Sequence, residues 1–246
     1  MSFCQDCVRG VRHGGTPEGK IETIGGITCY VGTPAGDYPK DKVILYIADA
    51  FGIDLFNTEY ASTLLLVDDF ARNGFKVVAP DHLHGDPIPA DIIPLDAVDP
   101  RVSPSAAIDS GTSTHLLLYR NIDIGAWAVN HGPNQTRPIL DAVVAALKEE
   151  GVTLFGATRY CFGVSVVAHP SILKAPDDIE VNQKVHTHSI QNELLGDGKF
   201  APGYARAHWE GCTHGFAVRG DLSNPLVKAG KEDAFSKSIE FFKKHL

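Results

Sequence analysis

The sequence of 246 residues predicts an α/β protein with a mostly parallel sheet and helices on both of its faces. The first observation is a continuous apolar run at 42–48 (KVILYIA), which is typical of a central strand that is buried on both faces. The second is a helical pattern at 57–73, which ends at Gly74 and is followed by another strand pattern at 75–79. A strand, a helix and a strand in this order predict a right-handed βαβ unit with two parallel strands.

Five further segments each show the pattern of one structural element, and with the βαβ unit they predict a single domain over 1–246. In chain order they are an extended arm (1–20), a β-hairpin (21–33), a long helix (135–150), a buried strand (152–155) and a C-terminal helix (231–244). The long helix is predicted by one apolar stripe that ends at Gly151. Residues 80–100 carry five prolines, which indicates a loop across the top of the sheet, whereas 101–123 fits neither period and is interpreted as an atypical insert.

Composition and charge exclude several classes of protein. With a net charge of −8, the chain lacks the basic balance of a general nucleic-acid-binding protein. No apolar run approaches the roughly 18 residues that can span a bilayer, and the first residues contain no apolar signal core. We therefore expect a cytoplasmic protein that binds neither nucleic acid nor membranes.

The five cysteines have no spacing typical of a disulfide framework, and they lie at positions 4, 7, 29, 161 and 212. An odd number of scattered cysteines suits a reducing cytosol. Cys4 and Cys7 form a C-x-x-C pair, but a zinc site would need a second pair of ligands, and His13 is the single candidate nearby. We expect two surface thiols here and no metal.

Cys161 is the candidate nucleophile because of its position just past the predicted strand at 152–155. In a nucleophile elbow, a sharp strand-to-helix turn exposes the nucleophile above the sheet, usually within Gly-x-nucleophile-x-Gly. The segment RYCFG at 159–163 has the second of these glycines and has Arg159 in place of the first. Downstream, His214 lies on a glycine-bounded loop (GCTHGF) that is expected to follow a strand. A nucleophile first and a histidine last is the chain order of α/β-hydrolases.

Three polar residues are expected to meet at one edge of the sheet. Asp49 directly follows the first strand of the βαβ unit, Asp81 lies two residues after the second, and Cys161 follows the next predicted strand. Ligands of parallel sheets bind beyond the carboxyl ends of the strands. This edge is therefore the predicted position of the site.

Five stretches of the chain together resemble the dienelactone hydrolase family in its fungal form. They are FCQDC (3–7), ILYIADAFGI (44–53), DDFARNGFKVVAPD (68–81), RYCFG (159–163) and GCTHGFAVRGD (211–221). The resemblance implies an α/β-hydrolase fold, a Cys-His-Asp triad and the hydrolysis of small esters or lactones. It implies neither a metal nor an organic cofactor.

The resemblance also implies roles for the catalytic candidates. Cys161 would be the nucleophile, and His214 the base that takes and returns the proton. Asp49 stands where family members often carry an acidic residue that interacts with the resting cysteine. Structural roles are the alternative for all three: a buried inert thiol, a satisfied loop histidine, and a cap for the helix after Asp49.

Backbone groups and one arginine complete the site that the resemblance implies. The N–H of Phe162, with that of either Ala50 or Phe51, would form the oxyanion hole. Arg219 follows the histidine at about the place of an arginine that binds a substrate carboxylate.

The sequence departs from the family pattern in three places. A strand-like run at 164–168 begins directly after Gly163, which leaves no room for the long helix that should follow the nucleophile. Between 170 and 200 no acidic residue follows a strand-like run, so the triad acid is not identified, and 101–123 has no family counterpart. We therefore predict a fold that is incomplete after the elbow and an impaired hydrolase. The alternative function is a non-catalytic relative that binds a small acidic metabolite or a partner protein.

For the region after the nucleophile we expect one of two forms. Either 164–168 takes the place of a distant strand and draws the chain across the top of the sheet, or 156–168 forms an irregular turn. In neither form does a helix start at Phe162. Two origins of the departures remain open: a coding sequence misassembled near 101–123, 163 and 182, or a divergent member of the family.

Overall fold

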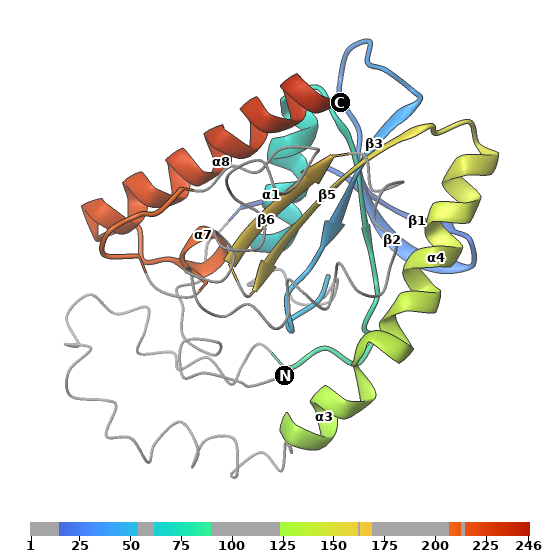
Figure 1. The fold of residues 1–246 in the computed structure, drawn as a ribbon, viewed down its shortest axis with the longest axis horizontal. Coiled ribbons are helices and arrows are strands. Elements are labelled where there is room, and N and C mark those ends of the chain that lie inside the picture. The colour runs from blue at the N-terminus through green and yellow to red at the C-terminus, as the bar shows by residue number, and fades with distance from the viewer. Residues whose placement is uncertain (1–14, 54–61, 90–123, 162, 169–206, 213–214) are drawn as a thin grey trace, which may run out of the picture.

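The computed structural model describes residues 15–53, 62–89, 124–161, 163–168, 207–212 and 215–246 (Figure 1). Within these residues, six strands form one sheet in the order β1-β2-β4-β3-β5-β6. The strands are β1 (Lys20–Ile24), β2 (Ile27–Gly32), β3 (Lys42–Ile47), β4 (Lys76–Pro80), β5 (Leu154–Cys161) and β6 (Gly163–Ala168). The helices are α1 (Ser62–Arg72), α3 (Ile124–Asn130), α4 (Pro133–Glu149), α7 (Phe216–Arg219) and α8 (Pro225–His245).

The centre of the sheet is parallel and its margins are antiparallel. β3 lies between β4 and β5 and is parallel to both, whereas the pairs β1–β2, β2–β4 and β5–β6 are antiparallel. β3, α1 and β4 form the predicted βαβ unit. The predicted α/β class with helices on both faces is therefore confirmed, and in the described part of the sheet parallel pairing is confined to the three central strands.

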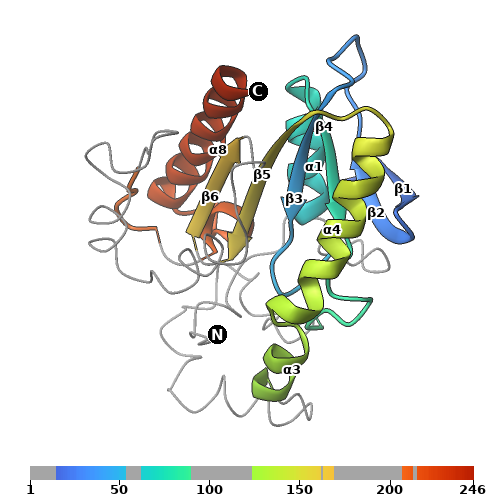
Figure 2. The ribbon, with the colours of Figure 1, turned by 45° about the vertical axis from the view of Figure 1, so that its right-hand side comes forward.

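Two apolar cores, one on each face of the sheet, follow from the period of two along the strands. Ile44 and Tyr46 of β3 belong to the core under α1, α7 and α8, whereas Val43 and Leu45 belong to the core under α4. Figure 2 shows α4 along one face, with α1 and α8 on the other. All four side chains are buried, each with a stabilisation of roughly 1.5–3 kcal/mol. Burial on both faces explains why this strand is continuously apolar.

Glycine, proline and asparagine set the ends of the hairpin and of two helices. Gly25 and Gly26 have φ angles of 59° and 78°, which suit the two-residue turn between β1 and β2. α4 starts at Pro133; the first residue of a helix has no intrahelical partner for its N–H, so proline loses no hydrogen bond there. At the other end, Gly151 (φ 98°) follows the C-cap residue of α4. The side chain of Asn224 caps α8 by accepting a hydrogen bond. The predicted hairpin and both predicted helices are confirmed.

One buried carboxylate fastens the described end of the N-terminal arm to α1. Asp68 accepts hydrogen bonds from the backbone N–H groups of Glu18 (2.8 Å) and Gly19 (3.1 Å). The hydroxyl of Tyr30 donates to the same carboxylate at 2.8 Å. Two backbone donors of the arm and one hydroxyl of β2 thus share a carboxylate of α1. Residues 1–14, with the C-x-x-C pair, lie outside the described residues.

The main departure from the predicted fold comes after the strand predicted at 152–155. β5 runs on through Cys161, where a turn was expected, and reverses into the antiparallel strand β6. The register pairs Cys161 with Gly163, and Phe162 between them lies outside the described residues. The strand predicted at 164–168 is confirmed. The irregular turn that we expected at 156–168 was wrong, whereas the course of the chain after Ala168, which the other expected form concerns, lies outside the described residues. The valine-rich sequence of β6 favours direct pairing with the neighbouring strand.

The strand that we expect before His214 is not tested by the structure. The described residues 207–212 contain a turn, and 169–206 lie outside the described residues. The insert at 101–123 and the interval in which the triad acid was sought lie outside the described residues. Across the part of the chain that the structure describes, no helix combines the length and the apolar character needed to cross a bilayer.

Candidate active site

The carboxyl ends of the three parallel strands meet at one edge of the sheet, as predicted. The register of β3 and β5 pairs Ile47 with Arg159. Asp49 and Cys161 each lie two residues further along, so their backbones reach this edge at the same level. Asp81 directly follows β4, which lies on the other side of β3. The structure therefore gathers candidates from three strands where parallel sheets bind ligands.

Asp49 is buried together with Arg219, from which it is separated by 170 positions in the chain. Their side chains expose 3% and 6% of their surface, and the guanidinium donates to Oδ2 of Asp49. The backbone N–H of Phe51 donates to Oδ1 at 3.0 Å, and the Phe51 ring centroid lies 4.9 Å from the guanidinium carbon. Each buried charge thus has a partner, as an interior of low dielectric constant requires.

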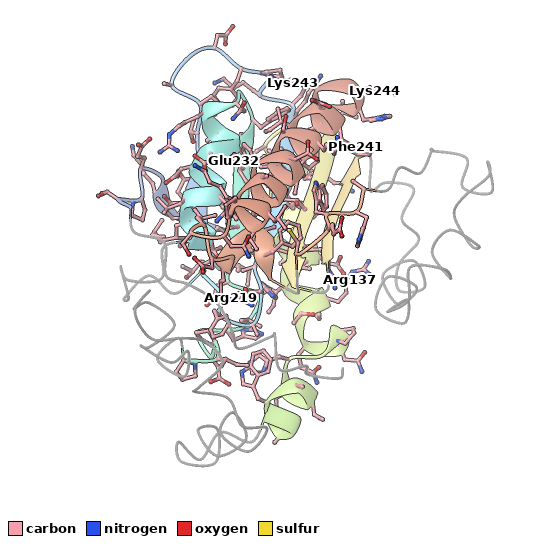
Figure 3. The ribbon with its side chains drawn as sticks, turned by 90° about the vertical axis from the view of Figure 1, so that its left-hand side faces the viewer. Arg137, Arg219, Glu232, Phe241, Lys243 and Lys244 are labelled. Carbon is pink, nitrogen blue, oxygen red and sulfur yellow. The ribbon has the colours of Figure 1, made fainter. Side chains whose placement is uncertain are left out.

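The short helix α7 positions Arg219, and a glycine makes this possible. Gly215 precedes the helix with a φ of 83°, a left-handed conformation that glycine adopts without strain. A Cβ atom at Gly215 would lie 2.9 Å from Nη2 of Arg219. In Figure 3, Arg219 lies toward the end of α8 opposite Lys243 and Lys244. Gly215 directly follows His214 in the sequence, and His214 itself lies outside the described residues.

In the turn after β3, the peptide between Ala50 and Phe51 is hydrogen-bonded through both its carbonyl and its N–H group. The carbonyl of Ala50 accepts a hydrogen bond from the N–H of Ile88 at 2.8 Å, and the N–H of Phe51 is bound to Asp49. The peptide between Ala50 and Phe51 therefore cannot rotate without breaking a hydrogen bond. Within the described residues the Ala50 N–H donates to no acceptor. Of the two alternatives for an oxyanion donor, Ala50 is thus the one that is available.

The loop that supplies Ile88 is itself fixed to α3. Nε1 of Trp127 donates to the carbonyl of Asp86 at 2.8 Å, and the Asp86 carboxylate lies 3.4 Å from Nε2 of His131. The rings of Trp127 and His131 stack with their centroids 4.3 Å apart. The described part of the proline-rich loop therefore runs over the carboxyl edge, as predicted, and supports Ala50.

One of the two histidines in this loop, His82, is held by its structural surroundings. His82 is buried, and this burial lowers the pKa of its imidazole. Its Nδ1 lies 3.4 Å from the carbonyl of Pro80. No cluster of three or more His, Cys, Asp or Glu side chains in the described ranges is arranged to hold a metal ion.

Three predicted site residues are described in part or not at all. Phe162 and His214 lie outside the described residues, and for Cys161 the structure describes the backbone alone. The pairing of Asp49 with Arg219 was missed by the sequence analysis. A signal was present, because an aspartate that directly follows a doubly buried strand needs a cation to offset its desolvation.

Comparisons with known proteins find one family and several fungal relatives. The profile of the dienelactone hydrolase family matches residues 27–194. Hydrolase pyvD of Aspergillus violaceofuscus is 28% identical over 276 residues, which cover 98% of this chain and 96% of that protein. Hydrolase tropI of Talaromyces stipitatus is 24% identical, with coverage of 98% and 95%. Dienlactone hydrolase 2 of Gibberella moniliformis is 24% identical, with coverage of 96% and 92%.

The alignment with pyvD is longer than the chain itself. It spans 276 positions against 246 residues, so at least 30 positions have no counterpart here. The relative thus contains sequence that this chain lacks. The family match spans more than half of the chain and includes both Asp49 and Cys161. The chain therefore belongs to the dienelactone hydrolase family, whose members are hydrolases with the α/β-hydrolase fold.

Proposed function

We propose that this hydrolase cleaves small carboxylic esters or lactones with Cys161 as its nucleophile. The observation that carries the proposal is the level position of Cys161 and Asp49 at the carboxyl edge, where Asp49 is paired with Arg219. Family membership supports the reaction class. The chain order, with Cys161 first and His214 last, supports their roles as nucleophile and base.

The proposed reaction uses two half-reactions. His214 accepts the thiol proton of Cys161, and the thiolate attacks the acyl carbon to form a tetrahedral intermediate. The leaving alcohol takes the proton from His214, which then activates water to hydrolyse the thioester and regenerate the thiol. Two backbone N–H groups, of Ala50 and Phe162, stabilise the oxyanion by roughly 3 kcal/mol each. The Ala50 N–H belongs to the peptide between Asp49 and Ala50, whose carbonyl accepts a hydrogen bond from the N–H of Gly52 at 2.9 Å. This restraint supports the role of Ala50, because a fixed donor needs no reorganisation during the reaction.

Arg219 is the proposed binding residue for a carboxylate on the substrate. Its guanidinium is paired with Asp49, so a substrate carboxylate has to compete with Asp49 for it. The exchange would keep Arg219 neutralised and leave Asp49 charged at the level of Cys161, where it can act on the thiol. We therefore expect esters that carry a carboxylate to be preferred over neutral esters of the same size.

The β5–β6 hairpin is expected to lower the activity. A cysteine at a helix N-terminus gains thiolate stabilisation from the helix dipole. Here Gly163 begins a strand. The missing dipole is worth up to about 2 kcal/mol, a roughly thirtyfold effect on the thiolate fraction. We propose that the chain is a slow hydrolase for this reason.

Hydrolysis of 4-nitrophenyl butyrate by three proteins tests the nucleophile. We expect Cys161→Ala to fall to the rate of buffer alone. Cys212→Ala is the matched control, because it removes a half-buried thiol to which the proposal gives no role in the reaction, and it should keep the wild-type rate. Equal rates for Cys161→Ala and the wild type would overturn the proposal.

The hairpin favours a second candidate function, a non-catalytic protein that binds a small acidic metabolite at Arg219. Alkylation by iodoacetamide, resolved by peptide mass spectrometry, separates the two. Burial raises the pKa of Cys29 to about 12 and also raises that of Cys212, so both serve as unreactive references. The ordinary pKa of a thiol is about 8.5, so an activated Cys161 should be alkylated by iodoacetamide at a pH well below this value. An ordinary profile at Cys161 would favour the binding protein.

A further inference from the structure

Lys231 differs from the other paired lysines of α8. Lys228 and Lys237 are exposed and lie 3.9 and 3.5 Å from acidic side chains of the same helix. Lys231 is half-buried, and its ammonium donates to the carbonyl of Val218 at 3.1 Å. Val218 is the residue before Arg219 on α7. A costly half-buried cation is therefore placed next to the proposed carboxylate-binding residue.

The hydrogen bond satisfies a group that α7 leaves without a partner. α7 is a single turn, so the carbonyl of Val218 lacks the N–H that a longer helix would provide. A cation at the C-terminal end of a helix also interacts favourably with its dipole. Lys231 therefore holds the short helix against α8 at the position from which Arg219 extends to Asp49.

We propose that Lys231 is a positioning residue for carboxylate recognition, because its ammonium anchors the α7 turn that carries Arg219. The proposal rests on the proposed function, in which Arg219 binds the carboxylate of the substrate. It assigns to Lys231 no contact with the substrate and no part in the chemistry at Cys161.

The charges around Lys231 make this anchor sensitive to pH. Burial lowers the pKa of Lys231 to about 8, against the opposing effect of the Asp69 carboxylate on α1. On α1, Asp69 is itself paired with Arg72 and lies next to Asp68. On α7, the nearby Arg219 is neutralised by Asp49.

The remaining charges near Lys231 on α8 form exposed pairs, Lys228 with Glu232 and Lys237 with Asp233. Exposed pairs of this kind are well screened by solvent. Asp69 is thus the main group that keeps Lys231 protonated. As the pH rises through about 8, Lys231 loses its charge, the anchor weakens, and the preference for carboxylate substrates should decline.

Two substrates that differ in one carboxylate isolate this effect. The probes are 4-nitrophenyl hydrogen glutarate, which has a free carboxylate, and the neutral 4-nitrophenyl pentanoate. The readout is the ratio of their kcat/KM values between pH 6.5 and 10, because the titrations of nucleophile and base cancel in this ratio. We expect the wild-type ratio to fall as the pH rises through about 8.

Three variants test whether Lys231 is responsible. Lys231→Met should lower the ratio about tenfold at pH 7, as expected for one charge-assisted hydrogen bond, mainly through KM for the glutarate ester. Lys231→Arg should restore the ratio and move its decline to higher pH, because a guanidinium stays protonated above pH 12. Lys228→Met, from the exposed face of the same helix, should behave as the wild type.

The free energy of unfolding should change with pH in the opposite direction to the carboxylate preference. Because the pKa of Lys231 is lowered on folding, the unfolded chain binds its proton more tightly, and its contribution to stability rises with pH above about 8. The free energy of unfolding of the wild type relative to Lys231→Met should therefore rise over the range in which the carboxylate preference falls. If the preference for the glutarate ester instead rises with pH together with the free energy of unfolding, Lys231 has a merely structural role. That result would overturn the proposal.

Calorimetric titration with glutarate gives the same information without turnover. Glutarate should bind the wild type and Lys231→Arg, and bind Lys231→Met about tenfold more weakly, the equivalent of one such hydrogen bond. If no ester is hydrolysed but this order of affinities holds, the proposed hydrolase function fails and the role of Lys231 stands. Equal affinities, equal substrate ratios in Lys231→Met and wild type, or no binding to the wild type would each overturn the proposal.

Discussion

The two sides of the carboxyl edge are built differently, although β3 and β5 are neighbours in the sheet. After β3 the chain turns at once, and hydrogen bonds from Arg219 and Phe51 hold both oxygens of Asp49. After β5 the chain reverses into a hairpin, so Cys161 belongs to a strand. The acid–arginine side needs only the βαβ unit and α7, whereas the nucleophile side depends on the connection that follows Cys161.

The largest effect should come from breaking the ordered side. Asp49→Ala removes the carboxylate that is paired with the buried guanidinium of Arg219, which is expected to lower the free energy of unfolding by about 3–5 kcal/mol. Urea unfolding measures the change. The double variant Asp49→Ala, Arg219→Met removes both charges and should regain most of the loss. A change below about 1 kcal/mol in the single variant would place the pair in the weak range of exposed pairs and contradict its burial.

A smaller loss of stability is expected from alanine at a glycine with positive φ. Comparing two such glycines should separate the effect of backbone strain from an effect on the position of Arg219. Gly215 and Gly26 have φ angles of 83° and 78°, but a Cβ at Gly26 would meet nothing within 4 Å. Alanine at either position should cost about 1–2 kcal/mol of stability through the left-handed conformation. Only Gly215→Ala should also reduce the preference for the glutarate ester, because its Cβ would displace the guanidinium of Arg219. An unchanged preference in Gly215→Ala would contradict the placement.

The smallest effect concerns the loop that supports Ala50. Trp127→Phe removes the hydrogen bond to the carbonyl of Asp86 and should cost about 1 kcal/mol of stability. Because this bond reaches Ala50 only through Ile88, we expect a modest fall in kcat and little change in KM. Val129→Ala, on the exposed face of the same helix, should change neither quantity. A rate loss in both variants would point to a general effect on α3.

The sequence predicts the ordered side well, because short-range patterns decide it. The apolar run of β3, the stripe of α4 and the glycines of the hairpin each specify one element. The pairing of Asp49 with Arg219 could not be predicted in the same way, since it joins residues 170 positions apart. It follows only once α7 is placed over the end of β3.

The far end of β5 could not be predicted from its own sequence. The segment GATRYC at 156–161 shows neither a clear alternation nor a continuous apolar run. It is a strand because β3 and β6 pair with it on both sides. Gly156 is needed there because a ring carbon of Phe242 lies 2.5 Å from the position of a Cβ. Such a requirement of tertiary packing leaves no local signal.

Trapping of an acyl-enzyme tests most directly whether the carboxyl edge is an active site with Cys161 as its nucleophile. The protein is quenched in acid within milliseconds of mixing with 4-nitrophenyl hydrogen glutarate, digested with trypsin and analysed by mass spectrometry. Cleavage after Arg159 and Lys174 yields a peptide, 160–174, in which Cys161 is the single cysteine. We predict a glutaryl thioester on this peptide that disappears with turnover and is absent from Cys161→Ala. Hydrolysis without an adduct on Cys161, or an adduct on another residue that turns over in Cys161→Ala, would contradict the account.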